Sequence, residues 1–403
     1  MKAVMYGGGN IGRGFIGMLF SASGYEVRFV DVVEAVVETL NRDHSYPVRI
    51  LSNAGHKDVL VENVSAVNGR DPEAVAEAIA DCDIMATAVG VNVLKFIVPN
   101  IAEGIRRRMA RNGGPLDIII CENLMDANKV LEGMLKAQLN ASEQAWMDAN
   151  IGLVEASIGR MVPVQTEEMK DGEPLRVCVE GYGFLPVDKA AFKGQIPNIQ
   201  GMVPFDPFDF YIKRKLYVHN MGHATCAYLG GLLGLDYIYQ AIDVEEIYTV
   251  VRLAMEESAR ALSQKYGVEL EAIMAHIDDL LNRFTNVTLK DTCQRVGGDP
   301  ARKLACHDRL IGSSLLIQEM GQTPVYIAIG AAAGLKRFLD EKGMEQTLDN
   351  AKALLTETSG LAEDSELVKR ILGMYEMILS GATIGQLRRK ADAIKAASCS
   401  EVI

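Results

Sequence analysis

The stretch KAVMYGGGNIGRG, residues 2–14, decides the fold of this chain. Its first five residues form a mostly apolar run, which is typical of a strand buried on both faces of a parallel sheet. The run leads directly into Gly7, Gly9 and Gly12, which have the GxGxxG spacing of a dinucleotide-binding turn. Gly7 permits the tight turn, Gly9 lets a pyrophosphate approach the backbone, and Gly12 lets the following helix pack against the strand. The stretch therefore predicts the first βαβ unit of a Rossmann-type domain.

The residues after this turn support the same interpretation. Helical spacing of apolar residues follows, so Asn10 and Ile11 lie in a first helical turn whose N–H groups would bind the pyrophosphate. A second apolar run ends at Asp31, which comes 19 residues after Gly12. Asp31 would accept hydrogen bonds from a ribose diol, and its charge would repel a 2′-phosphate. The sequence thus predicts NAD rather than NADP as the cofactor, and leaves Arg13 as either a phosphate contact or a solvated helix residue.

Two later strands are expected to end beside the cofactor, because ligands bind beyond the carboxyl ends of the strands in open α/β sheets. The first, residues 84–90, ends in glycine, and the alternative is a strand that simply stops there. Its candidate cofactor contacts are Thr87, Ala88, Val89 and Gly90. The second, residues 116–121, is followed by Glu122 and Asn123, which we expect to face the active site. Residues 59–67 have the pattern of a further strand pair.

The length of 403 residues favours two domains. Residues 174–207 contain five prolines and short strand-like segments, after which almost every segment has helical periodicity, including residues 208–235. We therefore predict an α/β, NAD-binding Rossmann-type domain in residues 1–200. A mostly α-helical domain that binds the substrate and carries the catalytic residues is predicted in residues 201–403.

Composition excludes several classes of function. The net charge of −12 argues against nucleic acid and anionic membranes as partners, which leaves a small molecule as the expected ligand. No apolar stretch is long enough to cross a bilayer, and the first strand leaves no room for a signal peptide. The cysteines are scattered without a CxxC pair, which predicts reduced thiols in a cytoplasmic protein. They are Cys82, Cys121, Cys178, Cys226, Cys293, Cys306 and Cys399.

The densest group of titratable side chains is KRKLYVHNMGH, residues 213–223. On an ideal α-helix Lys215, His223 and Asn220 project at about 0°, 80° and 140°, on one side of the cylinder. The group could therefore converge on one ligand, although a lysine at a helix start is more often solvated and a single histidine more often belongs to the core. The six histidines are dispersed and no zinc-ligand cluster is present, so no metal is expected.

The three residues Lys215, Asn220 and His223 match the KxxxxNxxH pattern of the polyol-specific long-chain dehydrogenases, the mannitol dehydrogenase family. Several other stretches resemble the branch of this family that acts on mannitol 1-phosphate, and the resemblance runs along essentially the whole chain. These stretches are GGGNIGRGFIG (7–17), HSYPV (44–48), TAVG (87–90), CENL (121–124) and RKLACHDRLIG (302–312).

The resemblance implies metal-independent oxidation of a secondary alcohol, here the interconversion of mannitol 1-phosphate and fructose 6-phosphate with NAD. Lys215 would be the general base, Asn220 with Asn123 would hold the oxygen that becomes the carbonyl, and His223 would fix the substrate. A free lysine has a pKa of about 10.4, so burial and nearby positive charge must lower the pKa of Lys215. Lys213 and Arg214 are candidates for that charge.

A phosphorylated substrate needs cations that converge on it. The candidates are Lys213, Arg295, Arg302, Lys303 and Arg309. Alternatively, several of these side chains cap helices or pair with Asp291, Asp299 and Asp308.

The chain departs from the family pattern at Gly159, where an acid is usual, and at Lys213, where a glutamate is common, and both changes put the exact substrate in doubt. The alternatives are a dehydrogenase of an unphosphorylated polyol, a hexuronate reductase, and, from another class, an NAD-binding sensor without turnover. The intact Lys215, Asn220 and His223 argue against the sensor.

Overall fold

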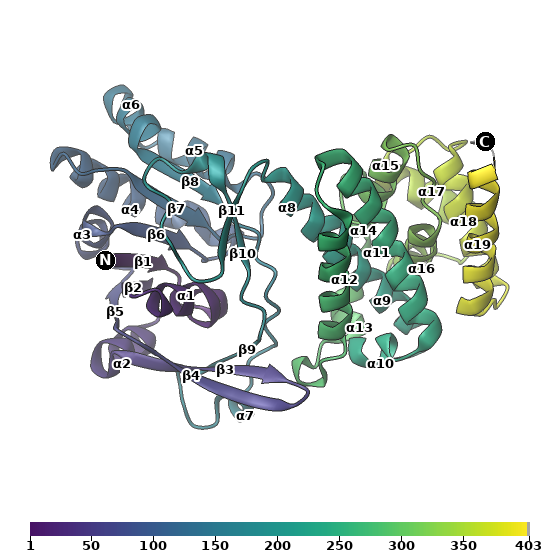
Figure 1. Ribbon diagram of the computed structural model, residues 1–403, viewed down its shortest axis with the longest axis horizontal. Helices are drawn as coiled ribbons and strands as arrows, with labels where there is room; N and C mark the ends of the chain where they lie inside the picture. The colour runs from purple at the N-terminus through teal and green to yellow at the C-terminus, as the bar shows by residue number, and fades with distance from the viewer. Residues whose placement is uncertain (401–403) are drawn as a thin grey trace. The chain divides into compact units, whose positions relative to one another are not determined.

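The computed structural model describes residues 1–400, with side chains described through residue 398. The chain forms two compact units, Met1–Asp209 and Phe210–Ile403 (Figure 1).

The first unit is built on a parallel sheet of six strands in the order β5-β2-β1-β6-β7-β8. The strands are β1 (Lys2–Tyr6), β2 (Glu26–Asp31), β5 (Val64–Asn68), β6 (Ile84–Thr87), β7 (Leu116–Ile120) and β8 (Ile151–Glu155). The chain winds outward from β1 through β2 to β5, and then from β6 in the opposite direction to β8. The strand order therefore reverses between β1 and β6, and this reversal is where a doubly wound sheet binds its ligand.

Side chains of β1 alternate between the two faces of this sheet, and both faces are buried. Ala3 and Met5 pack into one apolar core with the first helices of the chain, whereas Val4 and Tyr6 pack into a second core with later helices. The helices of the first core are η1 (Gly12–Gly17), α1 (Met18–Ala22) and α2 (Glu34–Asp43). Those of the second core are α3 (Pro72–Asp81), α4 (Val91–Ala110), α5 (Ala127–Lys136) and α6 (Ala141–Asn150). This two-sided covering explains the nearly continuous apolar runs of the strands.

Two smaller sheets complete the first unit. One has the order β4-β3-β9, from β3 (Ser45–Ser52), β4 (Gly55–Glu62) and β9 (Val177–Glu180). The other pairs β10 (Leu185–Asp188) with β11 (Met202–Phe205). Short helices are α7 (Glu167–Lys170) and the 3₁₀ turn η2 (Lys189–Ala191).

Residues 59–67 do contribute to two strands, as predicted, but β4 and β5 do not pair with each other because they belong to different sheets. A single residue, Asn63, separates the two strands and adopts a positive φ of 58°, so the chain turns from one sheet into the other.

The second unit is helical in its described residues. Its helices are α8 (Asp209–Arg214), η3 (Lys215–Asn220), α9 (Met221–Leu232), α10 (Ile238–Ile242), α11 (Glu245–Tyr266), α12 (Leu270–Phe284), η4 (Val287–Leu289), α13 (Cys293–Gly297), α14 (Pro300–Lys303), α15 (Ile311–Glu319), α16 (Tyr326–Lys342), α17 (Leu348–Ser359), α18 (Glu366–Leu379) and α19 (Ile384–Ser400). Helix α9 is buried at the centre of the unit. Helix α16 approaches it closely, since a Cβ on Gly334 would lie 2.8 Å from the Tyr228 ring of α9.

Six of the cysteines carry free thiols, as expected, and the side chain of Cys399 lies outside the described residues. Among the helices described, none combines the length and the hydropathy needed to cross a membrane.

Candidate active site

The glycine turn after β1 has the geometry that its sequence predicts. Gly7 has a φ of 104°, and a Cβ there would come 2.5 Å from the carbonyl oxygen of Ala88. A Cβ on Gly12 would overlap the carbonyl of Gly7, so neither position tolerates a side chain. A Cβ on Gly9 would meet nothing within 4 Å, which leaves open space beside the turn. The chain is helical from Asn10, and Arg13 donates its N–H to Gly9 as the first intrahelical bond. The N–H groups of this first turn are those that a helix offers to an anion.

Asp31 lies at the end of β2 and touches the same turn. Its Oδ2 accepts the N–H of Gly8 at 2.8 Å, and its Oδ1 accepts the N–H of Val33 at 2.9 Å. Each carboxylate oxygen keeps a lone pair for a further donor. Asp31 therefore shapes the turn as well as offering acceptors to a ribose.

Of the two roles considered for Arg13 from the sequence, the structure excludes that of a solvated helix residue. Its side chain is buried, and it donates from Nε to the carbonyl of Gly8 and from Nη1 to that of Leu175, each at 2.6 Å. The guanidinium thus ties the glycine turn to a segment more than 160 residues away in the chain. Two of its N–H donors thus hold the turn, and a contact between Arg13 and a cofactor phosphate stays a prediction.

The segment after β6 lies against the glycine turn. Thr87 is fully buried, and its Oγ1 has no hydrogen-bond partner in the structure. Ala88 donates its N–H to Tyr6 at 2.9 Å. Val89 and Gly90 donate their N–H groups to the carboxylate of Glu122, so these two amides are not available to a ligand. Asn123, the next residue along, is exposed.

The predicted helix over residues 208–235 is continuous from Asp209 to Leu232 and contains a π-helical turn at the candidate catalytic residues. Segment η3 (Lys215–Asn220) is π-helical, and Met221 donates its N–H to the carbonyl of Leu216, five residues earlier. A π-helix has about 4.4 residues per turn, so the five residues from Lys215 to Asn220 place Asn220 about 50° from Lys215 around the helix axis. The three α-helical residues from Asn220 to His223 turn back by about 60°, so His223 lies within about 20° of Lys215 around the axis. The side chains are therefore closer to one line than the 80° and 140° expected for an ideal α-helix, and π turns of this kind are frequent at functional sites.

Lys215 and Asn220 are uncommitted within the described residues, because neither side chain forms an ion pair or a hydrogen bond there. Burial lowers the pKa of Lys215 to about 8, and the positive charge of Arg309 contributes to the shift. The amine is thus able to give and take a proton near neutral pH.

His223 is held from two sides. Its ring stacks on Phe284 with centroids 4.8 Å apart, and its Nε2 lies 3.2 Å from Oδ2 of Asp291. Burial alone would raise the pKa of Asp291, but the contacts with His223 and Arg295 outweigh burial and lower it. His219 is buried nearby, and desolvation together with Arg283 lowers its pKa well below the usual range, so this imidazole is neutral. Asp291 and Phe284 have no local sequence signal, since they lie more than 60 residues from His223.

The candidate phosphate ligands differ in whether they already form ion pairs with carboxylates. Arg295 pairs with Asp291, Arg302 with Asp299 and Asp308, and Arg309 with Asp308. Lys303 is buried and forms no ion pair in the part of the chain that the structure describes. Burial and the charges of Arg309 and Arg302 lower its pKa to about 8. Lys213 is half-buried at the end of α8.

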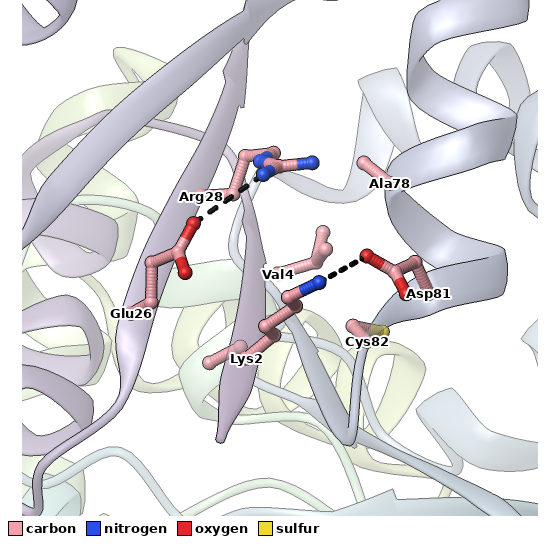
Figure 2. A pocket seen from close by; sticks show the side chains of 8 residues that line it. Lys2, Val4, Glu26, Arg28, Ala78, Asp81 and Cys82 are labelled. Carbon is pink, nitrogen blue, oxygen red and sulfur yellow. Dashed lines mark hydrogen bonds and ion pairs between the residues drawn. The ribbon is translucent and has the colours of Figure 1, made fainter.

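A small hollow at the opposite end of the central strands of the Rossmann sheet does not belong to this site. It lies at the amino ends of β1 and β2, where Lys2 pairs with Asp81 and Arg28 with Glu26 (Figure 2). The glycine turn and Asp31 lie at the carboxyl ends of the same strands. Among the side chains of residues 1–398, no group of three His, Cys, Asp or Glu is arranged to hold a metal ion.

Family models match nearly the whole chain. Residues 1–201 match the mannitol dehydrogenase Rossmann domain, and residues 208–379 match the mannitol dehydrogenase C-terminal domain. The chain belongs to the mannitol dehydrogenase family. This membership confirms the predicted fold class, an α/β Rossmann-type domain followed by a helical domain, and NAD as the cofactor.

Two solved structures of polyol dehydrogenases share this fold. A D-sorbitol dehydrogenase in substrate-free form superposes with a TM-score of 0.82 at 16% identity, over 96% of this chain and 94% of that one. The Pseudomonas fluorescens mannitol 2-dehydrogenase, in a ternary complex with NAD and D-mannitol, superposes with a TM-score of 0.72 at 14% identity, over 97% and 94%. At these identities the likeness concerns the fold.

Proposed function

We propose that this member of the mannitol dehydrogenase family interconverts mannitol 1-phosphate and fructose 6-phosphate, as a mannitol-1-phosphate 5-dehydrogenase. The observation that carries the proposal is Lys215, an uncommitted amine whose pKa is lowered to about 8 at the start of a π-helical turn. That turn brings Asn220 and His223 near the same line on the helix surface.

The residues divide the work of alcohol oxidation among them. NAD supplies the acceptor of the hydride when bound. Lys215 takes the proton of the reacting hydroxyl, and in the reverse direction returns it to the carbonyl oxygen. Asn220 and Asn123 donate hydrogen bonds to this oxygen as its negative charge grows, without a change in their own charge. His223, oriented by Phe284 and Asp291, binds a substrate hydroxyl. Because these residues supply both the base and the donors, we propose a metal-independent reaction.

The phosphate part of the proposal rests on Lys303 and Arg309. Lys303 is a buried amine without a carboxylate partner in the described residues, and its neighbours Arg302 and Arg309 are cationic. An anion placed beside these cations would remove their mutual repulsion. The proposed substrates and products are thus small molecules, a polyol and a sugar phosphate. We propose that the reaction takes place in the cytoplasm.

The carboxylates of Asp299 and Asp308 favour an unphosphorylated substrate as the second candidate. They already neutralise Arg302 and Arg309, which weakens the attraction of this region for an anion. A dehydrogenase of an unphosphorylated polyol is therefore the alternative, and a hexuronate reductase is a third.

A substrate panel separates these functions. Steady-state rates with NADH and fructose 6-phosphate, fructose or tagaturonate are expected to give the highest kcat/KM for fructose 6-phosphate. Lys303→Met should raise KM for fructose 6-phosphate by about 10- to 100-fold, since it removes a charge-assisted hydrogen bond to phosphate, and change KM for fructose little. Lys290→Met, at an exposed lysine nearby in the sequence, is the matched control. A preference for plain fructose would refute the phosphate assignment.

A further inference from the structure

Glu122 places a fixed negative charge at the carboxyl ends of β6 and β7. It follows β7 by two positions, and only 7% of the residue is exposed. Its Oε1 accepts the N–H of Val89 at 2.9 Å, and its Oε2 accepts the N–H of Gly90 at 2.8 Å. No Lys or Arg side chain of the described residues pairs with it. The carboxylate is therefore held by two dipoles, and no neighbouring cation neutralises its charge.

The two halves of NAD are distinguished by the strands that carry their contacts. Asp31 at the end of β2 offers acceptors to a ribose, and the glycine turn after β1 offers N–H groups to the pyrophosphate. A dinucleotide binds across the reversal of strand order, so its other nucleotide belongs to the side of β6 and β7. The residues present fit such a ligand, because Gly9 leaves open space and the buried hydroxyl of Thr87 lacks a partner. Glu122 thus lies on the nicotinamide side of the sheet.

The charge of the nicotinamide ring depends on its oxidation state, since the oxidised ring is cationic and the reduced ring is neutral. We propose that Glu122 sets the preference of this protein for the oxidised cofactor, because its carboxylate attracts the cationic ring and has no such attraction for the neutral one. The proposal rests on NAD as the cofactor and holds for any of the candidate substrates. By linkage, stronger binding of the oxidised form shifts the equilibrium on the enzyme toward the alcohol.

Glu122 also holds the backbone, and this second role has to be separated from the first. Gly90 adopts a φ of 92°, and the carbonyl of Ala88 lies against Gly7 of the glycine turn. Loss of the two hydrogen bonds from Val89 and Gly90 would therefore disturb the cofactor site. A disturbed backbone weakens binding of both oxidation states alike, whereas a lost charge weakens binding of the oxidised state alone. The ratio of the two dissociation constants distinguishes these effects.

The test measures Kd for NAD⁺ and for NADH by calorimetric titration of the whole protein, without substrate. In Glu122→Gln the ratio Kd(NAD⁺)/Kd(NADH) is expected to rise on the order of 5- to 30-fold, the effect of one unit charge at partly buried range. Glu122→Asp keeps the charge and should keep the ratio near that of the wild type, even where both constants increase. An unchanged ratio in Glu122→Gln would overturn the proposal.

Glu155 provides a matched control. It ends β8, one strand further from β1 than β7, and the backbone N–H groups of Ala127 and Asn128 bond to its carboxylate. Glu155→Gln removes the same charge from a similar setting and should change the ratio less than about twofold. An equal effect in both variants would assign the preference to net charge rather than to Glu122.

A second variant guards against loss of folding in Glu122→Gln. Asn123 is exposed, so Asn123→Asp adds a negative charge beside Glu122 without disturbing the core. The ratio Kd(NAD⁺)/Kd(NADH) is expected to fall in this variant. If it stays unchanged, charge at this end of the sheet does not act on the nicotinamide ring, and the proposal is wrong.

Discussion

Replacing Arg309 with glutamine is expected to move the pH dependence of alcohol oxidation to higher pH. Oxidation needs Lys215 as the free amine, so the rate should rise with pH up to about 8, where the pKa of Lys215 lies. Burial is the main cause of the lowered pKa and the charge of Arg309 is the second. Removal of that charge raises the pKa, so the rise in rate should occur at higher pH. Ketone reduction needs the protonated amine and should instead fall above the same pH.

The size of the effect follows from the fraction of free amine. With its ordinary pKa of 10.5, Lys215 would be about 0.03% deprotonated at pH 7, whereas with a pKa of about 8 it is about 10% deprotonated. The environment therefore supplies about a 300-fold increase in the reactive form. In Arg309→Gln the fraction of Lys215 present as free amine should be lower than in the wild type at pH 7 and nearly the same above pH 10.

The assay is kcat/KM for mannitol 1-phosphate oxidation between pH 6 and pH 10.5. Arg302→Gln is the matched control, because Arg302 lies in the same segment and does not contribute to the pKa shift of Lys215. Lys215→Ala should lower kcat by about 10²- to 10⁴-fold, abolish the rise near pH 8 and leave NAD affinity nearly unchanged. A rise at the same pH in wild type and Arg309→Gln, or a rise near pH 8 that persists in Lys215→Ala, would refute the reasoning.

Two further predictions concern carboxylates that accept backbone N–H groups. Asp31→Ser should relax discrimination against NADP. Because Asp31 also accepts the N–H groups of Gly8 and Val33, the substitution should in addition weaken NAD binding about tenfold or more. Cofactor titrations measure both effects, and a wild type that prefers NADP would contradict the prediction. Glu257 of α11 accepts N–H groups at the start of α16, and burial raises its pKa to about 7 from an ordinary 4.5. The free energy of unfolding should therefore fall by about 3 kcal/mol between pH 4.5 and pH 7 relative to Glu257→Gln; denaturant titrations that show a pH-independent difference would exclude this linkage.

Much of the cofactor site could be predicted because its requirements are local. Gly7 needs a positive φ, Gly12 must pass close to a carbonyl, and Asp31 must end the next strand, and each of these is a property of a short stretch. The spacing of Lys215, Asn220 and His223 likewise belongs to one helix. A pattern of this kind can be recognised in the sequence because residues close together in the chain form it.

The remaining features arise from contacts between distant segments, which only the tertiary structure brings together. The guanidinium of Arg13 is turned inward by the carbonyl of Leu175, and His223 is oriented by Asp291 and Phe284. The lowered pKa of Lys215 likewise comes from burial and from Arg309, since the adjacent Lys213 and Arg214 are not among its causes. The sequence by itself determined the cofactor and named the candidate reactive side chains, whereas packing decided their surroundings and the pKa of Lys215, because desolvation and charge act through space rather than along the chain.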